Sequence, residues 1–480
     1  MIPTGRNESR RLLGLFRFSQ VRTLTTTLTC FAIALVIAFV PEYPGLSDAG
    51  HRTLFVLVLA AGMWVSEAIP AFATSLLAIG CLIALLGRPD GVYANGEHDW
   101  EQFITPWGSP LIWLFFGGFC LALSAEKTGL DRWLAARALG LFGQRPGMLL
   151  LGIMLVTAVL SMFMSNTATA TLVLAMMTPI FASRPSGDGV SKAICLGVAF
   201  AANIGGMGTI IGTPPNAIAA GLLEGQSAVN FAEWMLLGVP PALLMLAIAW
   251  FYLIFVHLKK DAFSDEKGIL FYAGVASDPA PIHKQYVVVT TFIVTVGLWM
   301  TSPLHGLPTT LISFVPIVFL TTTGILSGPD IRTLPWDILL LITGGLSLGV
   351  AIEKTGLATW AVGYLPIEGM SPVALALGFS YATLLMANLM SHTASANIIL
   401  PISIAVLTAS KATGGDARLA VPIALAASAG MCLPISTPPN AIVYSGGHLK
   451  VTDMFAGGLL IGLIAPLILV FWAELALNWL

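Results

Sequence analysis

Long apolar segments separated by short polar stretches run through the whole chain. Because a helix of about 20 apolar residues crosses the hydrocarbon core of a bilayer, each such segment predicts a membrane-spanning helix. Uninterrupted spans are expected near residues 24–41, 53–68, 71–87, 108–126, 230–257, 286–303, 309–326, 337–355 and 455–478. Two further spans, near 190–225 and 417–445, are interrupted by glycines and prolines. The pattern predicts an all-α polytopic membrane protein.

Two other apolar blocks have a length that fits neither one crossing nor two. Residues 147–183 would form a helix roughly 55 Å long, against a hydrocarbon core of about 30 Å, and residues 372–410 form a similar block. Each block has a polar trio near its centre, Ser165-Asn166-Thr167 in the first and Ser391-His392-Thr393 in the second. A re-entrant helical hairpin with the trio at its tip accounts for both features. We therefore expect about 11 transmembrane helices plus two re-entrant hairpins.

Composition and charge agree with a membrane protein. Hydrophobic residues make up 56% of the chain and charged residues only 10%, far from the balance of a soluble domain. The net charge of −2 gives no reason to expect a nucleic-acid partner. With the N-terminus inside, 17 of the 22 lysines and arginines fall on the inner side, as the positive-inside rule requires. We expect a multi-pass protein of the cell (inner or plasma) membrane, with a cytoplasmic N-terminus and an outer C-terminus.

Three motifs occur twice at nearly constant spacing. Glu-Lys-Thr-Gly-Leu begins at 126 and again at 353, the polar trio at 165 and 391, and Thr-Pro-Pro-Asn-Ala-Ile at 213 and 437, with offsets of 227, 226 and 224 residues. Such matched spacing indicates an internal duplication. An odd number of crossings separates the copies, so they would have opposite orientations in the membrane, as in many secondary transporters.

The duplication predicts four parts. An N-terminal cytoplasmic segment with the first transmembrane helix occupies 1–50, and a cytoplasmic linker occupies 259–284. The first inverted repeat is expected at 51–258, with its hairpin tip near 165–167 and a broken helix near 205–216. The second is expected at 285–480, with its tip near 391–393 and a broken helix near 433–440.

The tips and the broken helices together predict a site for a cation and an organic anion. Polar trios in hydrocarbon are tolerated where they line a cavity or meet a partner, and two tips entering from opposite faces would approach each other near the midplane. The proline pairs at 214–215 and 438–439 break their helices and free backbone carbonyls. Hydroxyl, amide and carbonyl oxygens suit a hard cation such as sodium, whereas helix N-termini suit a carboxylate.

Other interpretations of the same residues are weaker. A Ser/Asn/Thr trio often serves helix packing, but its occurrence at two tips, each followed by Thr-Pro-Pro, disfavours packing here. His392 could be a structural histidine. An enzyme would need an activated nucleophile or a metal, and the seven histidines do not cluster. A channel uses similar elements, and saturable, trans-stimulated flux would distinguish a carrier from it.

These motifs resemble the divalent anion:sodium symporter family, which has two Ser-Asn-Thr motifs at hairpin tips and two Thr-Pro-Pro motifs in broken helices. The segment Glu-Ala-Ile-Pro at 67–70 is similar to another family motif, and the resemblance spans nearly the whole chain. It implies a homodimer in which a scaffold domain holds the dimer contact and a transport domain moves as an elevator. The expected function is a sodium-coupled secondary transporter of C4-dicarboxylates such as succinate, malate or fumarate. A sodium-independent dicarboxylate or tricarboxylate exchanger and a carrier of sulfate or another oxyanion are the alternatives.

The resemblance also implies which residues bind. A first sodium site would use Ser161, Ser165, Asn166 and the backbone at Gly212. The substrate would meet residues of both tips and both breaks: Asn166, Thr167, Ser391, His392, Thr393, Thr213, Thr437 and Pro438.

The second sodium site departs from the family pattern. His392 stands where the family has asparagine, and Ala387, which matches Ser161, has no hydroxyl. Only Ser391 and the backbone near Ser436 remain as ligands. A protonated imidazole would supply the charge that a second cation otherwise brings. We therefore expect one sodium site, with the second absent or weak.

Overall fold

In the computed structural model, the structure is described for residues 6–88, 91–92, 96–185, 187–223, 228–259, 262, 281–364, 370–410 and 416–478. These residues form helices and turns and contain no strand, so the all-α prediction is confirmed. Most of the predicted linker, 259–284, lies outside the described residues.

The helices before the linker follow the apolar segments. They are α1 (Arg6–Phe39), α2 (Asp48–Ser66), α3 (Ala71–Leu82), α4 (Pro110–Thr128), α5 (Leu130–Leu139), α6 (Pro146–Ser161), α7 (Asn166–Ala182), α8 (Gly189–Gly205), α9 (Pro214–Leu222) and α10 (Phe231–Leu253). Shorter turns are η1 (Ile83–Gly87), η2 (Asp99–Phe103), η3 (Thr105–Gly108), η4 (Gly206–Gly208), η5 (Ile210–Gly212) and η7 (Ile254–Leu258).

The helices after the linker follow a similar order. They are α11 (Ile282–Met300), α12 (Ser302–His305), α13 (Thr309–Thr322), α14 (Gly328–Arg332), α15 (Trp336–Lys354), α16 (Leu357–Tyr364), α17 (Pro372–Leu389), α18 (His392–Ser410), α19 (Asp416–Ser428), α20 (Pro438–Ser445) and α21 (Val451–Ala476). Long α15 and short α16 stand in the order of α4 and α5. The paired helices α17 and α18, the interrupted α19 and α20, and the long α21 likewise stand in the order of α6 to α10.

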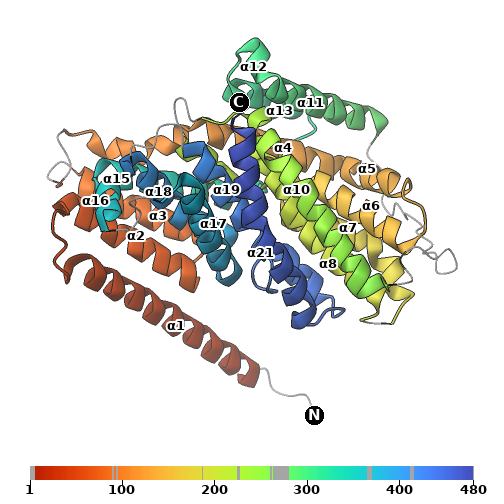
Figure 1. Cartoon of the computed structure of the whole chain (residues 1–480), viewed down its shortest axis with the longest axis horizontal. Coiled ribbons are helices and arrows are strands. Elements are labelled where there is room, and N and C mark those ends of the chain that lie inside the picture. Colours follow the sequence, from red (N-terminus) through yellow and green to blue (C-terminus); the bar gives the residue numbers. More distant parts are fainter. Residues whose placement is uncertain are drawn as a thin grey trace.

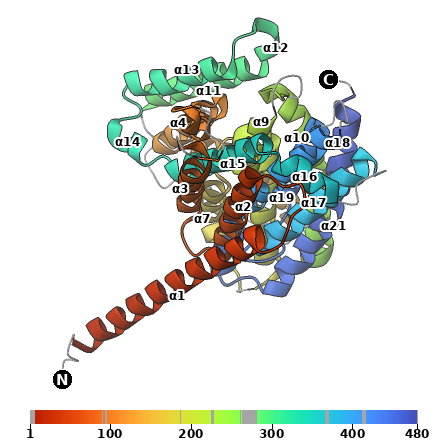
Figure 2. The same cartoon turned by 90° about the vertical axis from the view of Figure 1, so that its left-hand side faces the viewer.

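Helices from the two halves of the chain pack against each other (Figures 1 and 2). α3 contacts α15, and α4 contacts α13. The helices that follow the two breaks also cross between halves, because α9 contacts α18 and α19 while α20 contacts α7 and α8. α1 packs on α2 and extends away from the rest of the molecule (Figure 2). Neither half therefore forms its core alone.

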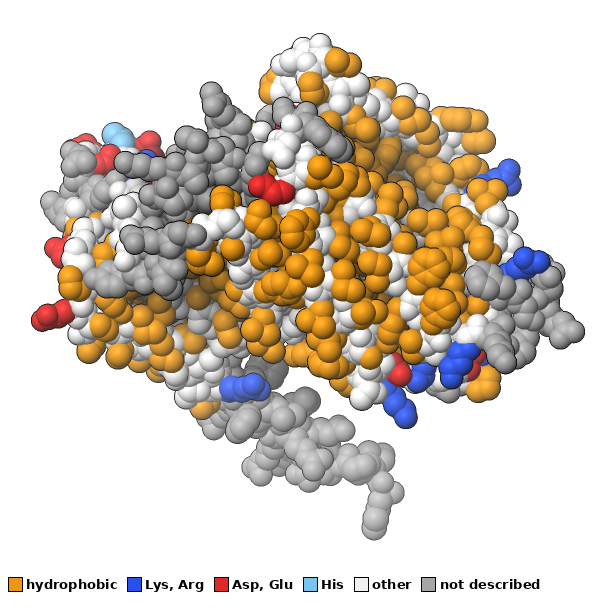
Figure 3. Space-filling model, viewed as in Figure 1, with side chains coloured by type: hydrophobic (Ala, Val, Ile, Leu, Met, Phe, Trp, Pro, Cys, Tyr) orange, Lys and Arg blue, Asp and Glu red, His pale blue; other side chains and the backbone are white. Residues whose placement is uncertain are grey.

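The surface is that of a membrane protein. Eight helices of the described part are long and apolar enough to cross a membrane, and several apolar helices are shorter. Hydrophobic side chains gather over the middle and right of the face in Figure 3, whereas most of the visible lysines and arginines lie near its lower and right-hand edges. α8 is nearly all buried, so its broken end lies inside the protein. The number of crossings and the orientation of the termini stay predictions.

The duplicated Glu-Lys-Thr-Gly-Leu segments end equivalent helices. Gly129 follows α4 with φ 68° and Gly356 follows α15 with φ 72°, the left-handed conformation in which glycine commonly ends a helix. Lys127 donates to Asp330 Oδ2 in α14, and Lys354 donates to Gln102 Oε1 in η2 at 2.9 Å. Each lysine thus links its helix end to the other half.

Candidate functional site

The serine of each polar trio begins a helix. α6 ends at Ser161, and Ser165 precedes α7, where its hydroxyl accepts a hydrogen bond from the Ala168 amide at 3.2 Å. α17 ends at Leu389, and the Ser391 hydroxyl accepts from the Ala394 amide of α18 at 3.2 Å. These are N-cap bonds, which satisfy amides that have no partner within their helix. Each trio therefore stands at a helix N-terminus between two apolar helices.

Both predicted broken helices are interrupted at the Thr-Pro-Pro motifs. Thr213 (φ −154°, ψ 145°) and Thr437 (φ −145°, ψ 152°) are extended, and the prolines occupy the first positions of α9 and α20. A proline disfavours helical geometry in the preceding residue and is itself well suited to the first turn. The preceding helices end at Gly205 and Ser428. A segment without α-helix thus connects each pair, and the first of these segments contains the short turns η4 and η5.

The asparagine of each motif bonds back across its own break. Asn216 Nδ2 donates to the carbonyls of Gly206 (2.9 Å) and Thr209 (2.8 Å). Asn440 Nδ2 donates to the carbonyls of Met431 (3.0 Å) and Leu433 (2.9 Å). Both asparagines are fully buried. The two amides therefore hold unwound backbone that helical bonds no longer fix.

Oxygen atoms from three segments gather at the first tip. The Ser161 hydroxyl lies 2.7 Å from both Asn166 Oδ1 and the Ala202 carbonyl oxygen. A Cβ atom added to Gly206 would lie 2.8 Å from Asn166 Oδ1 and 3.1 Å from the Gly212 carbonyl oxygen. The structure therefore brings together three of the expected first-site residues, with Ala202 in addition. A hydroxyl, an amide oxygen and backbone carbonyls form a donor set suited to a hard cation.

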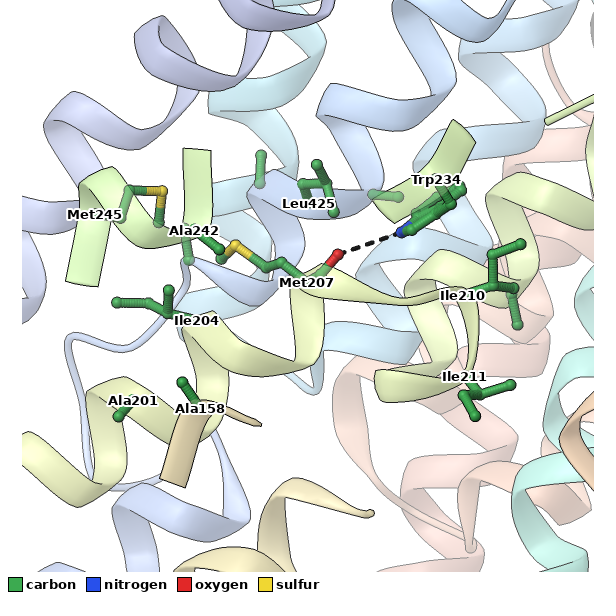
Figure 4. Close-up of a cluster of buried hydrophobic side chains, with 14 of the residues drawn as sticks. Ala158, Ala201, Ile204, Met207, Ile210, Ile211, Trp234, Ala242, Met245 and Leu425 are labelled. Carbon is green, nitrogen blue, oxygen red and sulfur yellow. Dashed lines mark hydrogen bonds between the residues drawn. The ribbon is translucent and has the colours of Figure 1, made fainter. Parts of the chain in front are cut away.

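Close packing holds the first break in place (Figure 4). Trp234 of α10 donates its indole N–H to the Met207 carbonyl at 3.2 Å. A Cβ atom added to Gly205 would lie 2.5 Å from Ala158 Cα of α6, so only glycine allows α8 to approach α6 this closely. Met207, Ile204 and Ala158 belong to one buried apolar cluster. The backbone that carries the oxygen atoms of the first tip is therefore closely packed on its other sides.

The second tip is arranged differently. His392 is 8% exposed, and its Nε2 lies 2.8 Å from the Gly430 carbonyl oxygen at the end of α19. Asn388 Oδ1 accepts from the Cys432 amide at 2.8 Å, and the Ser436 hydroxyl donates to the Asn388 carbonyl at 3.2 Å. Asn388 thus bonds to both Cys432 and Ser436, while His392 bonds separately to Gly430. No hydrogen bond joins Ser391 to Ser436 among the described contacts.

Asn388 is a residue that the sequence analysis missed. An amide side chain within an apolar segment, directly after Ala387, could have indicated its role. Asn203, in the helix before the first break, was also missed. Its Nδ2 lies 3.2 Å from both Thr437 Oγ1 and Asn440 Oδ1, so it crosses from the first half to the second.

The remaining expected substrate residues lie at the tips and at the starts of the post-break helices. Ser165, Thr167 and Pro438 are exposed, Thr393 is partly exposed, and Thr213 and Thr437 are buried. Because α9 contacts α18 and α20 contacts α7, each post-break helix lies beside the hairpin of the other half. The elements that carry the two tips and the two breaks therefore adjoin one another.

Comparison with known proteins gives consistent matches. A sequence model described as the sodium:sulfate symporter transmembrane region matches residues 21–480. The sodium-dependent dicarboxylate transporter SdcS of Staphylococcus saprophyticus is 33% identical over 474 residues, which cover 92% of this chain and 88% of the relative. SdcS of Staphylococcus aureus is 31% identical over 460 residues, with coverage of 88% and 85%.

Two solved structures share the fold at low sequence identity. The YdaH transporter of Alcanivorax borkumensis aligns with a TM-score of 0.52 and 15% identity over 88% of this chain and 98% of its own. MtrF of Neisseria gonorrhoeae, described as representing a class of antimetabolite efflux pumps, aligns with a TM-score of 0.55 and 13% identity over 88% and 97%. At this identity the likeness concerns the fold alone.

Proposed function

The chain belongs to the sodium:sulfate symporter family and is a membrane transporter rather than an enzyme, and we propose that it carries C4-dicarboxylates such as succinate, malate or fumarate together with sodium. Two relatives with about a third of their residues identical are named sodium-dependent dicarboxylate transporters. The observation that carries the proposal is the oxygen cluster at the first tip, formed by Ser161, Asn166, Ala202 and Gly212.

Sodium would bind at this cluster. Side-chain oxygens of Ser161 and Asn166 and the carbonyl of Gly212 are its ligands, with Ser165 beside them at the start of α7. The Ala202 carbonyl, within hydrogen-bond distance of Ser161, orients that hydroxyl or joins the ligand set. Neutral oxygen ligands leave the positive charge of the ion uncompensated, so a bound carboxylate nearby is favoured.

The dicarboxylate would bind between the tips and the breaks. Helices α7 and α18 begin at the two trios and present amides with the positive end of the helix dipole toward an anion. Thr167 and Thr393 add hydroxyl donors at the same ends, and Asn166 is shared with the cation site. Thr213, Thr437 and Pro438 form the opposite wall at the starts of α9 and α20.

The matching order of helices in the two halves supports an inverted-repeat transporter. We infer that α2 to α10 and α11 to α21 are the two repeats, that hairpins and broken helices form a transport domain, and that this domain moves as an elevator against a scaffold held in a homodimer. Alternating access then exposes one site to each side of the membrane in turn.

A sodium-independent exchanger is the second candidate, and one contact favours it. The His392 ring lies at hydrogen-bond distance from the Gly430 carbonyl, which takes up an oxygen that a second cation would need. With one cation site lost, coupling to sodium is weaker than in a carrier with two sites.

Uptake of labelled succinate into proteoliposomes tests the proposal. An inward sodium gradient alone is expected to drive accumulation, and unlabelled malate and fumarate should compete better than sulfate or citrate. Uptake that ignores sodium and requires preloaded dicarboxylate would establish the exchanger instead. Competition by sulfate alone would make the protein an oxyanion carrier.

A further inference from the structure

The residue that links the expected cation site to the expected substrate site is Asn203. It follows Ala202, whose carbonyl oxygen lies 2.7 Å from the Ser161 hydroxyl at the first tip. The Asn203 side chain bonds to the second half of the chain, because its Nδ2 donates to Thr437 Oγ1 and Asn440 Oδ1, each at 3.2 Å. Two consecutive residues of α8 therefore contact the first tip and the second break.

Both acceptors of Asn203 are fixed parts of the second break. Thr437 Oγ1 also accepts from the Asn440 amide at 3.2 Å and caps α20. Asn440 holds the unwound backbone through Met431 and Leu433. Asn203 therefore bonds to two groups that hold the start of α20 in place.

The duplicated position in the second half has no such link. Ala-Ala-Asn-Ile-Gly at 201–205 matches Ala-Ala-Ser-Ala-Gly at 426–430, so Ser428 stands where Asn203 does. α19 contacts α9 as α8 contacts α20, and Asn216 Oδ1 is the counterpart of Asn440 Oδ1. Yet Ser428 Oγ and Asn216 Oδ1 are fully buried without a hydrogen-bond partner among the described residues. A serine lacks the amide that would donate there.

We propose that Asn203 is a positioning residue that couples cation binding at the first tip to dicarboxylate binding at the second break. Closing of the Ser161, Asn166 and Ala202 oxygens around a cation fixes the end of α8. Through Asn203 this fixes Thr437 in the orientation that receives the carboxylate. The inference rests on the proposed function. Coupling then runs from the first half to the second through the amide of Asn203, and the second half has Ser428 at the matching position.

Coupling of two binding events is reciprocal. It can be measured as the factor by which sodium changes the affinity for succinate, which equals the factor by which succinate changes the affinity for sodium. We would measure succinate affinity of the purified protein with and without saturating sodium, and sodium affinity with and without succinate. Variants Asn203→Ser and Asn203→Leu both remove the amide group that reaches Thr437 and Asn440. The first copies the residue that the chain has at position 428. The second keeps the number and branching of the side-chain heavy atoms, so it leaves no cavity at the site. Ser428→Ala is the matched control.

In wild type, sodium should raise succinate affinity, and both Asn203 variants should lower this factor by about 5-fold or more, the lower end of typical couplings. Sodium affinity without succinate should stay within a few-fold of wild type, which a loss of folding would not permit. Ser428→Ala should leave the factor unchanged. An unchanged factor in a folded Asn203 variant would overturn the inference alone. Absence of any sodium effect in wild type would overturn sodium coupling and the inference together.

Discussion

The two hairpin tips derive from one duplicated motif but differ in what surrounds them. At the first, Ser161 and Asn166 meet the carbonyls of Ala202 and Gly212 in a cluster of oxygens. At the second, the matching tip residue is His392, and its ring bonds to the Gly430 carbonyl. The histidine at the second tip thus bonds to a backbone carbonyl, whereas the asparagine at the first tip lies within a cluster of oxygen atoms.

The breaks differ as well. Between the matching glycine and the Thr-Pro-Pro motif the first break is one residue longer, from Gly205 to Thr213 against Gly430 to Thr437. The longer segment includes Gly206, which lies beside both Asn166 and Gly212. In the first half this segment therefore lies directly against the tip residue Asn166. Two halves that share the order of their helices thus differ in the length of this segment.

Filling the first cluster should have the largest effect. In Gly206→Ala, the new Cβ would lie 2.8 Å from Asn166 Oδ1, so the amide must move and the cation loses a ligand. We expect the sodium concentration that gives half-maximal succinate uptake to rise by about 100-fold, the upper end of what a change in the groups around a metal ligand costs in affinity. Gly378→Ala, in the second hairpin and with open space around it, is the control. Equal sodium dependence in both variants would contradict the assignment.

Removing one hydroxyl should have the next largest effect. Ser161→Ala takes away the oxygen between Asn166 and Ala202, and we expect sodium half-saturation to rise by about 10-fold. The converse change, Ala387→Ser, adds a hydroxyl at the second tip, where His392 still holds the Gly430 carbonyl. It should leave sodium dependence unchanged. A stronger response to Ala387→Ser than to Ser161→Ala would reverse the comparison of the tips.

Restoring the second trio should have a smaller effect. His392→Asn with Ala387→Ser returns the side chains of the first tip to the second and releases the Gly430 carbonyl. We expect sodium activation of uptake to become more cooperative, with its half-saturation changing only a few-fold. The exposed His98→Asn serves as a control for loss of a histidine. Unaltered cooperativity would contradict the proposal that His392 prevents cation binding at the second tip.

The smallest effect concerns the duplicated lysines at the ends of α4 and α15. Hydrogen bonds from Lys127 first, and then Ser327, lower the pKa of Asp330 from its ordinary 3.8 to about 2. A lowered folded pKa contributes stability above pH 3.8 that is lost as pH falls toward 2. The melting-temperature difference between wild type and Asp330→Asn should thus be constant from pH 7 to 5 and shrink below about pH 4.

This difference should be small, since exposed ion pairs contribute about 1 kcal/mol or less. Lys354 bonds the neutral Gln102 instead, so Gln102→Ala should show no change in this pH range. A difference for Asp330→Asn that grows on acidification would contradict the assigned direction of its pKa.

The helices were largely predictable, because hydrophobic length and proline positions decide them. α6 and α17 end shortly before the polar trios, α7 and α18 begin within them, and α9 and α20 begin at the proline pairs. The family was predictable from the same duplicated motifs. Ala202, Asn203 and Asn388 were not, since their roles depend on which helix packs beside them. Every residue has a backbone carbonyl, so the sequence does not show that the carbonyl of Ala202 has a role. A buried asparagine has the same sequence pattern whether it bonds to its own helix or to the other half of the chain.

The ratio of sodium to dicarboxylate moved is the most direct test of the difference between the tips. Labelled sodium and labelled succinate would be followed in the same proteoliposomes, with wild type and Ser161→Ala compared under one gradient. A single sodium ion per succinate in wild type, with coupled flux lost in Ser161→Ala, is the result expected if only the first tip binds a cation. Two or more sodium ions per succinate, or sodium flux that survives in Ser161→Ala, would contradict it.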